Sequence, residues 1–236
     1  MLIIGDAIEV MRDLHSNSYG AVVTSPPYNI GVDYGVYDDK ISAQDYFDFT
    51  AGWVEQAVRV APVVVVNFGA PTSSAMNLAR FMCAVSEVAV VQSHIIWVKH
   101  ISSDEWSHGH FKPVNSERYL TNVHESVFIV SRRGDFKLDK LSVGVPFKDK
   151  SNIERFASNK GDVRCRGNVW YVPYETRQSK KAHPATYPLK LAEMMIKIVG
   201  TPGSVLDPFY GEGTTAEAAA KLGVACDGID LKDWTC

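Results

Sequence analysis

The alternation of short apolar segments with amphipathic ones is the feature of this 236-residue chain that most limits its fold. Short buried strands are expected at residues 2–4, 21–24, 63–66, 204–206 and 225–229, and helices at 7–14, 42–60, 189–199 and 214–222. The longest helix has an apolar face that includes Trp53 and Ala57, and Ser42 is its expected N-cap. Strands and helices that alternate in this way are typical of a doubly wound, mostly parallel α/β sheet.

Two further segments, 88–98 and 123–130, are rich in β-branched residues and predict a pair of long strands at one edge of the sheet. In a doubly wound sheet the ligand lies beyond the carboxyl ends of the strands. The loops that directly follow strands are therefore the first places to look for a functional site, and two of them have unusual sequences.

The loop at residues 207–215 joins the strand at 204–206 to a helix, and its two glycines allow a tight turn and close approach of a ligand to backbone N–H groups. A loop that binds a nicotinamide dinucleotide is the main alternative. Asp207 and Glu212 would repel a pyrophosphate, whereas they would attract the ammonium and sulfonium groups of S-adenosylmethionine. Asp230, at the end of the next strand, is placed as an acid that accepts hydrogen bonds from both ribose hydroxyls. A plain glycine turn at a helix start is the remaining interpretation.

The second loop, at residues 24–31, directly follows the strand expected at 21–24 and contains two consecutive prolines. Pro26 and Pro27 fix their φ angles and leave rigid carbonyl groups. The Ser25 hydroxyl and the Pro26 carbonyl are suited to accept the hydrogens of an exocyclic amine, which favours a pyramidal nitrogen with a free lone pair. Tyr28 would stack on a base that has been flipped out of a duplex. Taken alone, the segment is also consistent with a stiff turn.

Charge is distributed unevenly along the chain. Residues 131–182 contain 13 Lys and Arg against six Asp and Glu, a net charge of +7, whereas the rest of the chain carries −10. A basic segment in an acidic protein suits an insertion that binds a polyanion, although a solvated loop is the simpler alternative. The candidate residues for binding a polyanion, and DNA if the resemblance described below holds, are Arg132, Arg133, Lys148, Lys150, Arg164, Arg166 and Arg177.

With both loops in view, the chain resembles the β-class DNA amino methyltransferases, in which the catalytic motif precedes the cofactor motif. Residues 24–28 match the family's proline-proline-aromatic motif, and residues 207–215 match the form Asp-Pro-Phe-x-Gly-x-Gly-Thr-Thr of its glycine loop. Smaller likenesses lie at residues 5–6, 53–59, 64–69, 96–99, 124–125, 168–170 and 183–188. The whole set follows the family's order along nearly the entire chain.

The resemblance implies a fold of the class I S-adenosylmethionine-dependent methyltransferase type in circularly permuted order. It implies a catalytic half at residues 1–130, a target-recognition insertion at 131–182 and a cofactor-binding half at 183–236. The implied catalytic residues are Ser25, Pro26, Pro27 and Tyr28. The implied cofactor contacts are Asp6, Thr24, His183, Pro184, Asp207, Pro208, Phe209, Gly211, Gly213, Thr214, Thr215 and Asp230. No metal is expected, because the chemistry does not need one.

The target base is expected to be cytosine, methylated at N4, with adenine N6 as the alternative. Ser25 resembles the cytosine-N4 members at the first motif position, where adenine-N6 members carry Asp, and a hydroxyl can donate to the cytosine ring N3 as an ionised Asp cannot. Two features depart from the family pattern: Glu212 stands where Ser is usual, and the chain stops at Cys236 without a further helix. The expected partners are double-stranded DNA, a second copy of the chain that covers the exposed sheet face, and a cognate restriction endonuclease.

Other functions fit less well. RNA-base or protein-glutamine methyltransferases normally place the glycine loop before the proline motif, and a non-enzymatic nucleic-acid binder would leave both loops without a purpose. The four scattered cysteines, and the histidines at 100, 108 and 110, match no usual zinc spacing. The chain has no apolar run of membrane-spanning length and no basic leader, so we expect a cytoplasmic protein, associated with the nucleoid of a prokaryotic or phage-infected cell.

Overall fold

A computed structural model describes residues 1–234 of the chain, apart from 75, 101–114, 154–160 and 174–186. Its strands are β1 (Leu2–Ile4), β2 (Ala21–Thr24), β3 (Val63–Phe68), β4 (Val90–His100), β5 (His124–Ser131), β6 (Val169–Pro173), β7 (Ser204–Asp207) and β8 (Ala225–Asp230). Its helices are α1 (Ala7–Asp13), α2 (Ala43–Val60), α3 (Met76–Val88), α4 (Leu189–Ile198) and α5 (Thr214–Lys221), with a short 3-10 turn at Lys150–Asn152.

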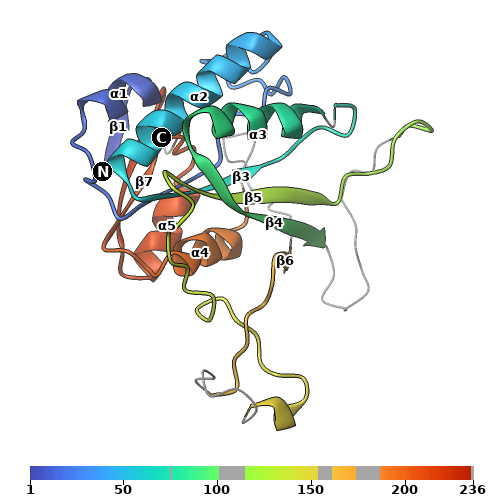
Figure 1. Ribbon diagram of the computed structural model, residues 1–236. Helices are drawn as coiled ribbons and strands as arrows, with labels where there is room; N and C mark the ends of the chain where they lie inside the picture. The colour runs from blue at the N-terminus through green and yellow to red at the C-terminus, as the bar shows by residue number, and fades with distance from the viewer. Residues whose placement is uncertain (75, 101–114, 154–160, 174–186, 235–236) are drawn as a thin grey trace.

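The strands form one sheet in the order β1-β8-β7-β2-β3-β5-β4-β6 (Figure 1). Every neighbouring pair is parallel except the two that β5 makes with β3 and β4. This arrangement confirms the predicted doubly wound, mostly parallel sheet. The carboxyl ends of β1, β8, β7, β2 and β3 consequently lie along the same edge of the sheet.

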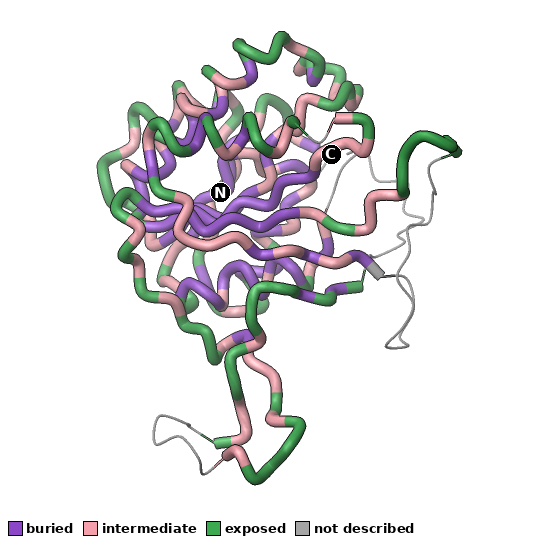
Figure 2. Tube along the Cα trace, turned by 45° about the vertical axis from the view of Figure 1, so that its right-hand side comes forward, coloured by how far each residue is buried: buried purple, intermediate pink, exposed green. Residues whose placement is uncertain are grey.

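Alternating side chains of the central strands feed two separate cores. Val22 and Val64 face α1, α2 and α3, whereas Val23 and Val65 face α4 and α5. The two helix layers cover opposite faces of the sheet, and the buried residues concentrate in the strands between them (Figures 1 and 2). Strands that are buried on both faces explain the unbroken apolar runs of the sequence.

Ser42 is the N-cap of α2, as predicted, and its hydroxyl accepts a hydrogen bond of 3.1 Å from the backbone of Asp45. Two elements differ from the prediction. Val88 ends helix α3, whose buried Phe81 and Val85 are four residues apart, so the strand expected from position 88 begins at Val90. The sheet also extends beyond the predicted strand pair, because β6 adds to β4 and takes the edge position.

The segment from 132 to 168 leaves the sheet after β5 and returns to it at β6. It first crosses the end of α4, where the Asp139 backbone N–H donates to Ile198 (2.9 Å) and the Ser142 hydroxyl donates to the Lys197 carbonyl (2.7 Å). It then projects away from the body of the protein, and a backbone bridge joins Val145 to Arg164 near its base (Figure 1). We call the described residues 139–153 and 161–168 the extension.

Candidate functional site

The two loops singled out in the sequence lie side by side at the carboxyl edge of the sheet. β2 and β7 are parallel neighbours, with Val22 opposite Leu206, so the loop after Thr24 and the loop after Asp207 emerge together. The Thr24 hydroxyl donates a hydrogen bond of 2.6 Å to the Asp207 carboxylate across 183 residues of chain. The two loops that the sequence predicts to hold the target base and the cofactor therefore meet at one place.

Asp207 is the centre of a buried hydrogen-bond cluster. Its side chain is 1% exposed and accepts hydrogen bonds from the hydroxyls of Thr24 and Thr215 and from the backbone N–H of Phe209. The hydroxyl of Tyr187 lies 2.5 Å from that of Thr215. Burial raises the pKa of Asp207 to about 7 although both threonine hydroxyls oppose the shift. This carboxyl group therefore changes its protonation state near neutral pH.

The glycine loop is shaped by two residues in left-handed conformations. Gly211 has φ 53° and Gly213 has φ 81°, and Gly213 is the N-cap of α5. A Cβ atom on Gly213 would stand 2.7 Å from the Tyr210 hydroxyl oxygen, so a larger residue would push this ring aside. The Gly211 backbone N–H donates a hydrogen bond of 2.8 Å to the Asp230 carboxylate, which ties the loop to the end of β8. The turn and the start of α5 thus bring backbone N–H groups and carboxylates to one surface.

The proline loop is held rigidly by its neighbours. The Tyr46 hydroxyl donates a hydrogen bond of 2.7 Å to the Pro27 carbonyl, and Asp39, only 2% exposed, accepts from the backbone N–H groups of the residues that follow Tyr28. In the described part of the chain a donor reaches the carbonyl of Pro27, but none reaches that of Pro26. The Pro26 carbonyl is therefore an acceptor that no described donor occupies.

A polar chain runs from the proline loop across three strands. The Ser25 and Tyr28 hydroxyls lie 2.7 Å apart, and the Tyr28 hydroxyl lies 3.3 Å from the Glu125 carboxylate. The Asn67 amide nitrogen donates to the Tyr28 oxygen (2.8 Å) and to Glu125 (2.6 Å). Lys99 contacts the other carboxylate oxygen of Glu125 at 2.5 Å. Burial, followed by the negative charge of Glu125, raises the pKa of Tyr28 well above its ordinary value, so the phenol keeps its proton.

The Tyr28 ring is packed closely. Its centroid lies 5.0 Å from that of Phe68, and a Cβ atom on Gly69 would stand 2.8 Å from the ring and 3.0 Å from the Glu125 carboxyl carbon. Only glycine leaves room at position 69 for this arrangement. The fixed ring suits a planar aromatic ligand that stacks against it.

Comparison with known proteins agrees with this geometry. A family model described as DNA methylase, for the N6 and N4 enzymes, matches residues 20–236. The chain belongs to the N6/N4 DNA methylase family. It is therefore a DNA methyltransferase in the broad sense of that family.

Similar members of this DNA methylase family cover almost the whole chain. The Type II methyltransferase M.HpaI of Haemophilus parainfluenzae is 27% identical over 240 residues, which span 98% of this chain and 69% of M.HpaI. The Type II methyltransferase M.SmaI of Serratia marcescens is 25% identical over 266 residues, which span 98% of this chain and 86% of M.SmaI.

Solved structures share the fold. The PvuII DNA methyltransferase, described as cytosine-N4-specific, superposes with a TM-score of 0.71 at 20% identity, covering 98% of this chain and 81% of the PvuII chain. The complex of M1.HpyAVI with S-adenosylmethionine superposes with a TM-score of 0.60 at 21% identity, covering 99% and 93%. The predicted class I methyltransferase fold is thus confirmed.

The structure places the remaining predicted cofactor residues less uniformly. Asp6 follows β1 at the same edge, where it caps α1 and accepts from the backbone of Ile8 at 2.9 Å. Phe209 packs edge-on against Trp53 at a centroid distance of 5.5 Å, which fixes the start of the glycine loop against α2. Asp230, expected at the ribose, accepts from Gly211 and from the Trp234 indole (2.9 Å). Further predicted members of this loop are Pro208 and Thr214, both in the described chain, whereas His183 and Pro184 lie outside the described residues.

The predicted DNA-binding residues fall into two groups. Arg132 and Arg133 follow β5 at the amino-terminal ends of β3 and β4, where Arg132 donates to the Val58 carbonyl (3.0 Å), so the structure does not bring them to the site. Lys148, Lys150, Arg164 and Arg166 lie on the extension, and Arg177 lies outside the described residues.

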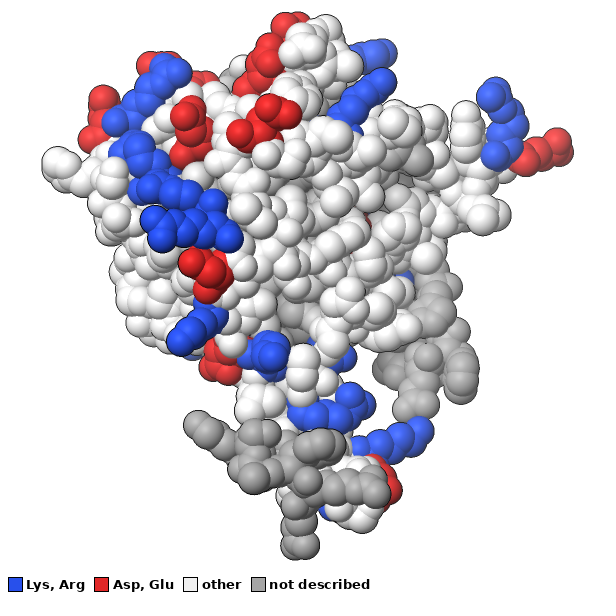
Figure 3. Space-filling model, in the orientation of Figure 1, with Lys and Arg blue, Asp and Glu red and all other residues white. Residues whose placement is uncertain are grey.

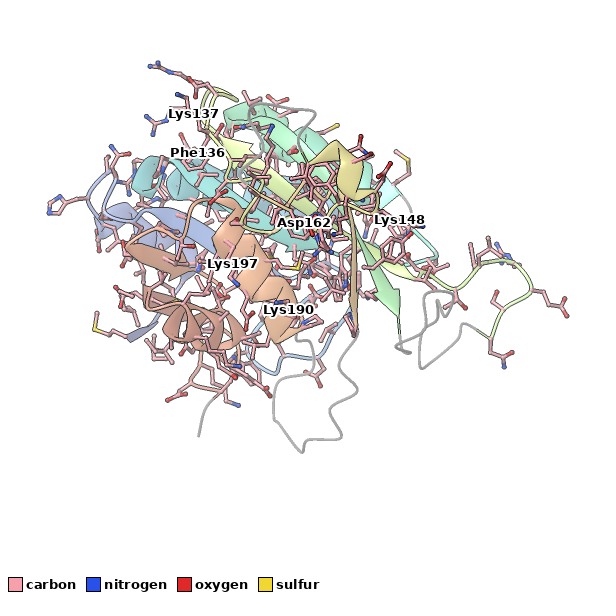
Figure 4. All side chains as sticks on the ribbon, turned by 90° about the horizontal axis from the view of Figure 1, so that it is seen from below. Phe136, Lys137, Lys148, Asp162, Lys190 and Lys197 are labelled. Carbon is pink, nitrogen blue, oxygen red and sulfur yellow. The ribbon has the colours of Figure 1, made fainter. Side chains whose placement is uncertain are left out.

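The extension residues differ in their contacts. Lys150 pairs with Asp162, and Arg166 donates to the Val143 carbonyl at 2.8 Å, whereas the side chains of Lys148 and Arg164 are exposed. Basic side chains are visible along the extension below the sheet (Figure 3). Seen from below, Lys148 and Asp162 lie on this extension, and Lys190 and Lys197 lie along α4 (Figure 4).

Three residues of the polar chain were not predicted as site residues. Asn67, Lys99 and Glu125 all lay in segments noted for their family likeness, and Glu125 also lay in the strand predicted at 123–130. Their common signal is a polar residue within or beside a run that is otherwise typical of a buried strand. Among the residues that the structure describes, no group of three or more His, Cys, Asp or Glu side chains could hold a metal ion. No helix in the described ranges has the length and apolar character of a membrane span.

Proposed function

We propose that the protein transfers a methyl group from S-adenosylmethionine to the exocyclic amine of a flipped DNA base, namely N4 of cytosine. The observation that carries this proposal is the hydrogen bond of 2.6 Å between Thr24 and Asp207, which holds the proline loop beside the glycine loop. A base bound by the proline loop and a cofactor bound by the glycine loop would therefore lie next to each other at one edge of the sheet.

The residues around the glycine loop fit S-adenosylmethionine. Gly211 and Gly213 have left-handed φ angles and no side chains, so a ligand could approach the backbone of this turn closely. Asp207, Glu212 and Asp230 give this edge an acidic character that suits an ammonium and a sulfonium rather than a pyrophosphate. When bound, the cofactor supplies an electrophilic methyl group.

The proline loop would hold and orient the target amine. The Pro26 carbonyl and the Ser25 hydroxyl oxygen would accept its two hydrogens, and the Tyr28 ring would stack on the base. Hydrogen bonds from Tyr46 and to Asp39 already fix this loop in the free protein. Binding of the base would therefore cost little conformational entropy in the loop.

Cytosine N4 is favoured over adenine N6 by the neutral serine at the first motif position. The PvuII enzyme of similar fold is described as cytosine-N4-specific, which supports the same assignment. M.HpaI and M.SmaI are both named Type II methyltransferases, which supports a Type II modification role. A companion endonuclease stays a prediction of the sequence. Duplex DNA would be contacted by the extension through Lys148 and Arg164. A homodimer stays a prediction of the sequence.

Transfer of labelled methyl from S-adenosylmethionine to DNA, followed by nucleoside analysis, tests the proposal. We expect N4-methylcytosine as the product. N6-methyladenine would correct the base alone, whereas absence of transfer to any DNA, together with absence of cofactor binding in calorimetry, would reject the function.

A further inference from the structure

A largely buried ion pair lies next to the proline loop, and the function proposed so far assigns it no role. The side chains of Lys99 and Glu125 are 11% and 14% exposed and come from adjacent strands, β4 and β5. Removing two charges from water is costly, and an apolar pair at such a position is often as stable or more so. The pair therefore points to a role beyond stability, and its contacts lead to Tyr28.

The donors and acceptors in this cluster determine the direction of its hydrogen bonds. Glu125, paired with the ammonium group of Lys99, is a carboxylate and only accepts. The Asn67 amide nitrogen only donates, and it reaches both Glu125 and the Tyr28 oxygen. The Tyr28 hydroxyl has one proton and two acceptors in reach, the Ser25 oxygen at 2.7 Å and the Glu125 carboxylate at 3.3 Å. The carboxylate is the stronger acceptor because it is charged, so it attracts this proton.

The direction continues to Ser25. If the proton of Tyr28 is directed at Glu125, the Tyr28 oxygen accepts from the Ser25 hydroxyl at 2.7 Å. The single proton of Ser25 is then used, and its oxygen has only lone pairs left for a ligand. This direction differs from the expectation that Ser25 donates to a ring nitrogen of the base.

We infer that Glu125 is a positioning residue that orients the Tyr28 and Ser25 hydroxyls, so that the Ser25 oxygen accepts a hydrogen from the target amine. Lys99 and Asn67 hold Glu125 in place for this task. The inference rests on the proposed function, because it assumes that the amine of a flipped base faces Ser25. If the inference holds, the preference of the site for an amine over a carbonyl group depends on all the hydrogen bonds from Lys99 to Ser25, and not on Ser25 alone.

Glu125→Gln tests the inference, because the amide has the size of the carboxyl group but can donate. A glutamine NH₂ directed at Tyr28 would turn the Tyr28 proton toward Ser25, and the Ser25 proton toward the ligand. Binding is measured with two duplexes that carry either cytosine or uracil at the methylated position, opposite an abasic site. Uracil replaces the amine with a carbonyl oxygen, and the abasic partner makes both bases equally free to flip. Adenine and hypoxanthine replace them if the product is N6-methyladenine.

The wild-type protein should bind the amine-containing duplex more tightly, and this preference should fall by about fivefold to tenfold in Glu125→Gln, the effect of one hydrogen bond. The turnover rate should fall in parallel, while calorimetric affinity for S-adenosylmethionine should not change. Glu87→Gln, an isosteric change on the exposed side of α3, is the matched control and should leave the preference intact.

An unchanged preference in a folded Glu125→Gln protein would overturn the inference while the methyltransferase function stands. If Glu125→Gln does not fold, Tyr28→Phe provides the second variant, because it keeps the ring but frees the Ser25 proton. It should show the same loss of preference, and a wild-type preference in Tyr28→Phe would also overturn the inference. Failure of the proposed function itself would appear differently, as a wild-type protein with no methyl transfer and no preference.

Discussion

Replacing Asp207 with asparagine should remove a large part of the pH dependence of stability. Burial holds the pKa of Asp207 at about 7, against an ordinary value of 3.8. The folded protein therefore binds this proton more tightly than the unfolded chain does, and ionisation destabilises the fold. A difference of about three pKa units corresponds to roughly 4 kcal/mol, which is present below about pH 4 and is lost as the pH rises to about 7.

The asparagine variant keeps the shape of the cluster. Its carbonyl oxygen can accept from Thr24, and its NH₂ group can donate to the Thr215 oxygen, so the change removes the titration and little else. Between pH 5 and pH 8 the wild-type protein should lose roughly 2.5 kcal/mol more unfolding free energy than Asp207→Asn. Urea unfolding followed by tryptophan fluorescence at both pH values measures this difference, and the titration of all other groups cancels between the two proteins. Parallel pH profiles would refute the assigned pKa and its origin in burial.

The same titration should appear in cofactor binding. A cationic ligand beside Asp207 favours the carboxylate, so binding releases the proton that the free protein holds below pH 7. Calorimetric affinity for S-adenosylmethionine should rise as the pH approaches about 7 and level off above it. In Asp207→Asn the affinity should be weaker and independent of pH in this range. Equal pH dependence in both proteins would show that Asp207 does not sense the charge of the ligand.

Three further substitutions test separate parts of the molecule. Tyr28→Ala should abolish methyl transfer but preserve cofactor binding in calorimetry, because the ring is proposed to contact the base and not the cofactor; wild-type activity would remove its stacking role. The Lys148→Ala, Arg164→Ala double variant should reduce the slope of log affinity for DNA against log salt by about two, because two cationic side chains no longer neutralise phosphates, and an unchanged slope would place the DNA elsewhere. Gly228→Ala should destabilise the protein by about 1–3 kcal/mol, because its Cβ atom would stand 1.9 Å from the Tyr210 ring. In thermal melts Tyr210→Ala should suppress that loss, and simple additivity of the two changes would contradict the clash.

Much of the site could be predicted because its two loops follow strands whose order in the sheet is limited by topology. The strand before Thr24 and the strand before Asp207 had clear apolar signals, and the meeting of their loops followed from parallel pairing. The polar chain behind Tyr28 could not be predicted in this way. Which of many polar residues lies next to Glu125 depends on the register of β3, β5 and β4, and this register is formed between segments far apart in sequence.

The errors have local causes. Helix α3 was missed because its buried residues, such as Phe81 and Val85, are few, and the β-branched run that follows masks its end at Val88. β6 was missed because it is only five residues long, with Trp170 and Val172 buried between exposed neighbours. The strand conformation of these five residues depends on their pairing with β4, which the local sequence alone does not reveal.

The position of the site follows from the way the chain leaves β2 and β7. After β2 the chain passes to α2 on one face of the sheet, and after β7 it passes to α5 on the opposite face. In open α/β sheets, ligands usually bind beyond two neighbouring parallel strands whose connections diverge in this way. The backbone pairing of β2 with β7 reaches only from Ala21 to Val22, so beyond it the strands are joined by the side chains of Thr24 and Asp207. A buried carboxyl group with a raised pKa at this junction costs stability in the free protein, and the cationic ligand proposed to bind there would offset that cost.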